Sequence, residues 1–139
     1  MQPSPPARLV LPVRIYYEDT DAGGVVYYAN YLRFLERART EWLRALGCGQ
    51  EQLMREQGIA FAVRSLAVEY LKPARLDDRV DVVAEIESLG RAQVVFRQRI
   101  ELGGETLVDA TVRVACLDLA RGKATAIPGE LHEKLKGLL

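Results

Sequence analysis

Apolar residues occupy every second position near the start of the chain, a period typical of a β-strand with one buried face. The pattern predicts a first strand over residues 9–18. The same alternation returns after Gly58 and is interrupted by glycine turns at Gly90 and at Gly103–Gly104. It predicts four further strands, which cover residues 61–71, 80–86, 94–102 and 107–117.

Between the first strand and these four, the apolar spacing changes to that of a helix. From residue 28 to residue 46, apolar side chains recur every three or four positions and include Phe34 and Trp42, which the pattern assigns to the core. On the polar side, Arg37 and Glu41 have the i,i+4 spacing of an ion pair. Two shorter helices are predicted over residues 50–57 and 128–138. The long helix and the sheet must then bury each other's apolar faces.

Composition favours one globular domain. The 139 residues are 49% apolar and 27% charged, and no stretch approaches the roughly 20 apolar residues of a membrane span. Three early prolines predict a disordered leader over residues 1–8, followed by a single domain over residues 9–139. The start lacks the pattern of a signal peptide, which predicts a cytoplasmic protein. A net charge of zero offers no attraction to nucleic acid or to an anionic membrane.

Two cysteines and one histidine offer little to a metal site or to a disulfide framework. Cys48 lies in a Gly-Cys-Gly turn, whereas Cys116 occupies an alternating apolar position and is predicted to be a buried thiol. With no Cys-x-x-Cys pair and His132 alone, a zinc or haem site has almost no ligands. The sequence therefore predicts a protein with no metal and no cofactor.

The segment from Asp19 to Gly24 is the clearest candidate for chemistry, because it connects the first strand to the start of the long helix. A helix N-terminus exposes unpaired N–H groups with partial positive charge, which can polarise a carbonyl oxygen. A carboxylate beside them can act as nucleophile or general base, and the glycines would let the backbone approach a ligand. Asp and Gly are also ordinary turn residues, so composition alone favours a simple turn.

Longer motifs around this loop resemble a known family. Residues 16–27 read YYEDTDAGGVVY, residues 29–39 read ANYLRFLERAR, and residues 63–78 read VRSLAVEYLKPARLDD. They are similar to the 4-hydroxybenzoyl-CoA thioesterase family and, within it, to the acyl-CoA thioesterases associated with the bacterial Tol-Pal system. The resemblance covers most of the chain. It implies an α+β hotdog fold, with an antiparallel five-stranded sheet wrapped around one long central helix, and hydrolysis of an acyl-CoA thioester.

The same resemblance implies roles for residues of the loop. Asp21 matches the family's catalytic aspartate, and Tyr28 matches the position whose backbone N–H polarises the thioester carbonyl. The Tol-Pal-associated enzymes usually carry histidine where this chain has Tyr28, so the resemblance does not extend to a histidine-assisted mechanism. Gly24, Val25 and Tyr31 are candidate substrate-binding residues, although Tyr31 fits the core as well. No cofactor is implied, since coenzyme A is part of the substrate.

Three further residues are candidate contacts for the coenzyme A phosphates, namely Arg64, Ser65 and Arg91, although solvated strand charges explain them equally well. The resemblance also implies a two-fold homodimer with a continuous sheet and shared sites, and pairing of dimers into a homotetramer. Contact with cell-envelope or lipid-synthesis proteins is a further hypothesis. The alternative function is a non-catalytic module that binds acyl-CoA or an acyl carrier. A hotdog dehydratase is disfavoured, because no histidine lies near Asp21 in the sequence.

Overall fold

The structure, a computed structural model, describes residues 7–139, so most of the predicted leader over residues 1–8 lies outside the described part. Strand β1 (Arg8–Arg14) is followed by a 3-10 turn (Tyr17–Asp19) and by the 18-residue helix α1 (Tyr28–Ala45). The remaining elements, in chain order, are α2 (Gln50–Gln57), β2 (Ile59–Tyr70), β3 (Arg79–Leu89), β4 (Gln93–Leu102), β5 (Glu105–Asp118), β6 (Lys123–Ala124) and α3 (Gly129–Lys136). Every predicted strand and helix is present.

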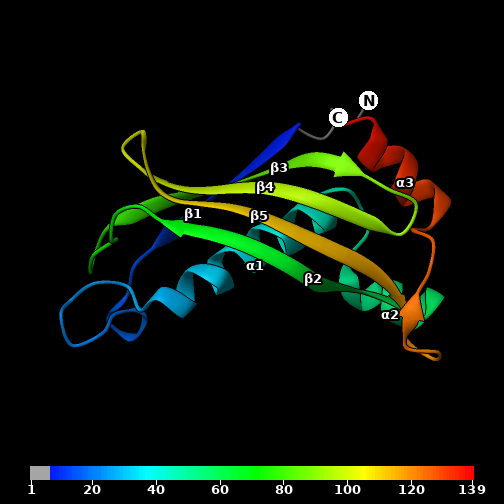
Figure 1. Ribbon diagram of the computed structural model, residues 1–139, viewed down its shortest axis with the longest axis horizontal. Helices are drawn as coiled ribbons and strands as arrows, with labels where there is room; N and C mark the ends of the chain where they lie inside the picture. The colour runs from blue at the N-terminus through cyan, green and yellow to red at the C-terminus, as the bar shows by residue number, and fades with distance from the viewer. Residues whose placement is uncertain (1–6) are drawn as a thin grey trace.

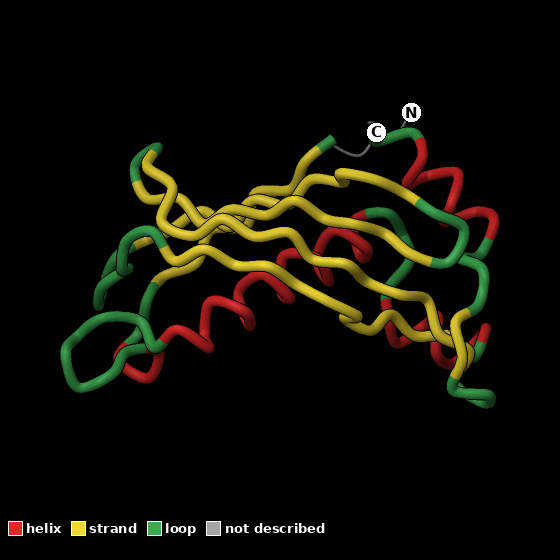
Figure 2. Tube along the Cα trace, viewed as in Figure 1, coloured by secondary structure: helices red, strands yellow, loops and turns green. Residues whose placement is uncertain are grey.

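Five long strands form one antiparallel sheet in the order β1-β3-β4-β5-β2, and the short β6 pairs with the end of β5. The sheet curls over α1, while α2 and α3 both lie at the same end of it (Figure 1). The predicted α+β hotdog architecture is therefore confirmed. Strands β1 and β2 form the two edges of the sheet, and α1 begins at the end of the molecule opposite α3, after the long loop drawn in green in Figure 2.

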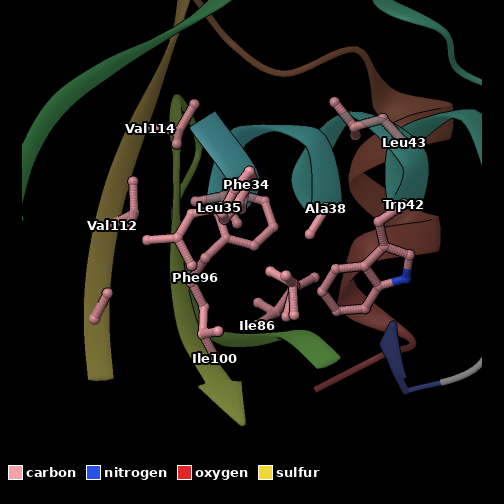
Figure 3. Close-up of a cluster of buried hydrophobic side chains, with 14 of the residues drawn as sticks. Phe34, Leu35, Ala38, Trp42, Leu43, Ile86, Phe96, Ile100, Val112 and Val114 are labelled. Carbon is pink, nitrogen blue, oxygen red and sulfur yellow. The ribbon is translucent and has the colours of Figure 1, made fainter. Parts of the chain in front are cut away.

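The core lies between one face of α1 and the sheet. From the helix, Phe34, Leu35, Ala38 and Trp42 are each no more than 1% exposed, as their spacing predicts. They meet side chains that alternate along the strands, and the ring centroids of Trp42 and Phe96 lie 6.1 Å apart (Figure 3). Burying a side chain of this size contributes roughly 1.5–3 kcal/mol. This face therefore holds α1 against the sheet.

The first strand is shorter than the alternation predicts. It ends at Arg14, and Tyr17–Asp19 form a 3-10 turn where the pattern predicts strand up to residue 18. The Asp19 carboxylate explains the difference, because its Oδ2 accepts a hydrogen bond from the Tyr16 N–H at 2.8 Å. A local bond of this kind competes with strand pairing. It directs the chain into the loop that precedes α1.

The predicted ion pair between Arg37 and Glu41 is wrong. The Arg37 guanidinium lies over the Phe34 ring, 5.7 Å from its centroid, and Glu41 pairs with Arg44 instead. Arg44 lies about two turns after Arg37, closer to the end of α1, where a cation is also favoured by the helix dipole. The Arg37 and Arg44 side chains are both exposed, and an exposed ion pair such as that between Glu41 and Arg44 contributes little to stability.

Two polar side chains are buried between α1 and the sheet. Gln98 on β4 is fully buried, donates through Nε2 to the Leu35 carbonyl at 3.0 Å, and accepts at Oε1 from Arg39 at 2.9 Å. Arg39 is 9% exposed. Burial lowers the pKa of its guanidinium below the ordinary value, an effect that the nearby Glu36 carboxylate opposes. The helix and β4 are thus joined by a polar link inside the core.

Candidate functional site

The loop between β1 and α1 is a compact turn held by backbone hydrogen bonds. The Asp21 N–H donates to the Val25 carbonyl at 2.9 Å, and the Gly24 N–H donates to the Asp21 carbonyl at 3.1 Å. Gly24 has a φ of 77°, in the left-handed region that favours glycine. The turn folds back on itself, so Asp21 lies beside the predicted binding residues Gly24 and Val25, just before the helix.

The connection between β2 and β3 holds this loop from the other side. The Val26 N–H donates to the Ala74 carbonyl at 2.9 Å, and the Ala74 N–H donates to the Tyr31 hydroxyl oxygen, also at 2.9 Å. Val25 and Arg75 form an additional β-bridge. Ala74 is completely buried. Its carbonyl and its N–H together link Val26 in the loop to Tyr31 in the first turn of α1. Tyr31 is therefore an anchor of the loop.

The N-cap residue of α1 provides no side-chain cap. Tyr28 is its first residue, and the preceding Tyr27 makes no capping hydrogen bond through its side chain. The Asn30 N–H donates to the Tyr27 carbonyl at 2.8 Å. The first N–H groups of a helix have no acceptor within the helix itself, and Tyr28 occupies the first of these positions. Its N–H and the positive end of the helix dipole can polarise a carbonyl oxygen placed there.

The Asp21 side chain is exposed, and one of its oxygens is engaged by the loop. Oδ1 accepts a hydrogen bond from the Gly23 N–H at 2.8 Å, as in an ordinary aspartate turn. Within residues 7–139, Oδ2 has no hydrogen-bond donor. A β-carbon at position 23 would lie 3.3 Å from Oδ1, so glycine leaves room for this orientation of the carboxylate. One oxygen thus orients the group while the other can act on a ligand.

A cleft of about 260 Å³ opens beside the start of α1 and is lined in part by Tyr28, Tyr31 and Tyr70. The ring centroids of Tyr31 and Tyr70 lie 5.7 Å apart, and those of Tyr28 and Tyr70 lie 6.1 Å apart. Burial raises the pKa of Tyr31, and burial together with the Tyr28 phenol raises the pKa of Tyr70. Both phenols therefore stay protonated at neutral pH. The cleft offers aromatic faces and neutral hydroxyl groups to a ligand.

The three candidate coenzyme A contacts lie away from this loop within one chain. Arg64 and Ser65 are exposed in the middle of β2, where Arg64 forms a β-bulge. Ser65 is five residues from Tyr70, which corresponds to roughly 17 Å along a strand. Arg91 follows β3 in the turn to β4, at the end of the sheet opposite the loop (Figure 1). A single chain does not bring these three residues to the tyrosine cleft.

The other candidate groups also lie outside the loop region. His132 lines a surface cleft with Arg91 at the far end, so it does not replace a histidine at position 28. In the described part of the chain, no three His, Cys, Asp or Glu side chains gather in a way that could hold a metal. Cys48 and Cys116 are free thiols, and Cys116 is buried as predicted. No helix among residues 7–139 is long and apolar enough to cross a membrane.

Comparison with known proteins identifies the family. A family model described as the thioesterase superfamily matches residues 23–108, which is more than half of the chain. The chain belongs to the thioesterase superfamily. The predicted family is thereby confirmed, and the protein is an enzyme that hydrolyses thioesters.

Relatives and a solved structure match this thioesterase over most of its length. The "Acyl-CoA thioesterase YbgC" of Haemophilus influenzae is 51% identical over 120 residues, which cover 86% of this chain and 88% of that protein. The "Acyl-CoA thioester hydrolase YbgC" of Escherichia coli O6:H1 is 49% identical over 126 residues, or 90% and 93% of the two chains. A crystal structure described as a "Probable Thioesterase from Bartonella henselae" has a TM-score of 0.82 at 33% identity, and the match covers 87% of this chain and 99% of that one.

Proposed function

We propose that this thioesterase hydrolyses acyl-CoA, with Asp21 as the acidic catalytic residue and the Tyr28 backbone N–H as the donor that polarises the thioester carbonyl. Either the Asp21 carboxylate attacks the carbonyl carbon, or it takes a proton from a water molecule that attacks. The carbon–sulfur bond then breaks, and coenzyme A leaves as a thiol after gaining a proton. In the first route the acyl group stays on Asp21 as a mixed anhydride, and water then cleaves that bond to release the carboxylic acid and restore the Asp21 carboxylate. In the second route the attacking water itself supplies the second oxygen of the acid.

The observation that carries this proposal is the position of Asp21 in a turn fixed against the start of α1. Its backbone is bonded to Val25, and its Oδ1 is oriented by the Gly23 N–H at 2.8 Å. Both relatives described above are named for action on acyl-CoA. The tyrosine cleft at the same helix end supplies an apolar surface for the acyl group, as ligand sites usually do.

Substitution of Asp21 by asparagine tests the proposal. The amide oxygen can still accept from the Gly23 N–H, so the loop should keep its shape while the carboxylate is lost. We expect kcat for acyl-CoA hydrolysis to fall by roughly a hundredfold or more. Asp19→Asn is a matched control, because Asp19 lies in the same segment and its Oδ2 accepts from the Tyr16 N–H. The control should stay within about threefold of wild type.

Release of free thiol from a panel of acyl-CoA substrates measures turnover, and thermal unfolding establishes that each variant is folded. Near-normal turnover by folded Asp21→Asn would exclude the carboxylate from the mechanism. Binding of acyl-CoA by the wild type without turnover of any substrate would favour the alternative, a non-catalytic binding module.

The active form is proposed to be a two-fold homodimer in which two β2 strands pair edge to edge. Within residues 7–139, β2 has no neighbour on its outer side, and a sheet edge of this kind tends to pair with another chain. Each site would combine the Asp21 loop of one subunit with strand residues of the other, which would explain the distance between Arg64 and its own loop.

Sedimentation at micromolar concentration should give at least a dimer. A compact, fully active monomer would refute the shared site and leave Asp21 chemistry intact. Further pairing into a tetramer remains a prediction.

A further inference from the structure

Arg39 is the one charged side chain that is buried within residues 7–139. Its guanidinium donates to Gln98 at 2.9 Å and forms no ion pair with any carboxylate of the described chain. A guanidinium has five N–H donors, and burying a charge without a counter-ion is strongly unfavourable. Within residues 7–139, the Arg39 guanidinium therefore lacks an ion-pair partner.

The space beside Arg39 is a groove that leads to the free edge of β2. It holds about 470 Å³ between α1 and β2, and its apolar lining consists of Leu32, Leu35, Val63, Leu66 and Val112. The bulge at Arg64 turns both Val63 and Leu66 towards this groove, where they are 46% and 44% exposed. Exposed apolar side chains that cluster in this way mark a surface for protein contact, and arginine is among the residues enriched at interfaces.

Glu36 gives the same groove a negative charge. It lies three residues before Arg39 on α1, lines the groove, and accepts a hydrogen bond from the Thr40 hydroxyl at 2.7 Å. Glu36 and Arg39 do not form an ion pair within the chain. A two-fold axis brings every patch of surface against its own copy. A patch that carries both charges side by side is therefore complementary to itself.

We infer that the groove is occupied by α1 of a second copy of this chain, whose Glu36 pairs with Arg39, while its Arg39 receives Glu36 of the first copy. The inference rests on the homodimer proposed above and adds the contact that fixes its register. Each guanidinium is then held between Gln98 of its own chain and a carboxylate of the other, an arrangement that favours charge-assisted hydrogen bonds. The same contact covers Val63 and Leu66.

Charge reversal tests the pairing. Glu36→Arg or Arg39→Glu alone brings like charges together in both contacts, so sedimentation equilibrium should show Kd for the dimer raised roughly a hundredfold or more. An equimolar mixture of the two variants should regain wild-type association, because the mixed dimer has opposite charges in both contacts. Glu41→Arg and Arg44→Glu are matched controls with the same spacing on α1. That pair is bridged within the chain, so its reversal should change Kd by less than about threefold.

Circular dichroism and thermal unfolding show whether each variant is folded. If Arg39→Glu does not fold, the comparison of Glu36→Arg with Glu41→Arg decides the question alone. A wild-type Kd in Glu36→Arg, or a mixture of folded variants that does not recover, overturns the pairing. A wild type that hydrolyses acyl-CoA as a monomer also overturns it but leaves the proposed activity standing. Recovery in the mixture supports the pairing even if the wild type proves inactive on acyl-CoA.

The groove has one other candidate occupant, an acyl group that ends in a carboxylate. Unchanged association of Arg39→Glu, together with selective loss of turnover on such an acyl-CoA, would assign Arg39 to the substrate and overturn the inference.

Discussion

Replacing Tyr31 by phenylalanine removes one oxygen atom and leaves the ring in place. That oxygen accepts the Ala74 N–H at 2.9 Å, and Ala74 is completely buried, so water cannot easily replace the lost acceptor. A buried N–H group without a partner costs about 1–3 kcal/mol. For a domain of this size, we expect Tm to fall by roughly 4–12 °C.

The same substitution should impair catalysis through the loop. The Ala74 carbonyl holds the Val26 N–H at 2.9 Å, and Val26 lies in the segment that pairs with the Asp21 turn. A catalytic group displaced by a fraction of an ångström lowers the rate of reaction more than it lowers binding. We therefore expect kcat to fall about tenfold with a smaller change in KM.

Tyr70→Phe is the matched control for this prediction. The Tyr70 ring lines the same cleft, but it is 46% exposed and its hydroxyl makes no hydrogen bond to the described residues. Its loss should change stability by less than about 0.5 kcal/mol. Thermal unfolding and acyl-CoA hydrolysis are measured on the same samples. Equal stability of Tyr31→Phe and Tyr70→Phe would refute the role of Tyr31 as an anchor.

Three further predictions concern the loop and the cleft. Tyr28→Phe should keep most of its activity, because the proposed donor is the backbone N–H; a hundredfold loss on the best substrate would make the phenol a participant. Gly24→Ala meets no atom of residues 7–139 within 4 Å but must hold a φ of 77°, which costs about 1–2 kcal/mol and should lower kcat. The control is Gly104→Ala, at a φ of 85° in the β4–β5 turn, which should lose similar stability but keep its kcat. Equal losses of kcat in Gly24→Ala and Gly104→Ala would contradict the role of the loop. The raised pKa of Tyr31 means that the unfolded chain releases this proton at a lower pH than the folded chain. Its contribution to stability is therefore complete below about pH 10 and is lost as pH rises further. The free energy of unfolding, measured by denaturation between pH 8 and pH 11, should decline less steeply with pH in Tyr31→Phe than in the wild type. Parallel curves for the two proteins would contradict this prediction.

The order of elements could be predicted because the apolar period changes clearly between strand and helix. The site could be located for the same reason. The Asp19–Gly24 segment lies between apolar residues spaced as in a strand and apolar residues spaced as in a helix. The role of Asp21 could not be predicted from the period. Aspartate and glycine form turns in proteins of every function, and Asp21 does form such a turn with Gly23. Its proposed chemistry depends on the longer family motifs.

The contacts that hold the site could not be predicted, because they join residues far apart in the sequence. Ala74 is a small residue after Pro73, and nothing in that segment indicates that it bonds to Tyr31, 43 residues earlier. Gln98 was detectable as a polar residue at an inward position between Phe96 and Ile100. Its partner Arg39 is 59 residues away, and a periodic pattern carries no information about such a pair.

The position of β1 at the sheet edge has a consequence for synthesis on the ribosome. Its partner is β3, so Arg14 opposes Arg79, a residue made 65 positions later. Strand β2 likewise cannot pair within the chain until β5 has been synthesised, because Ile59 lies opposite Asp118. At roughly 5–20 residues per second, both edge strands and the apolar face of α1 remain unpaired for several seconds. We expect β3, β4 and β5 to associate first, since they are joined by short turns. The helix and both edges would then close over them after most of the chain has left the ribosome, and a nascent-chain protease-protection assay should detect no protected species before β5 emerges.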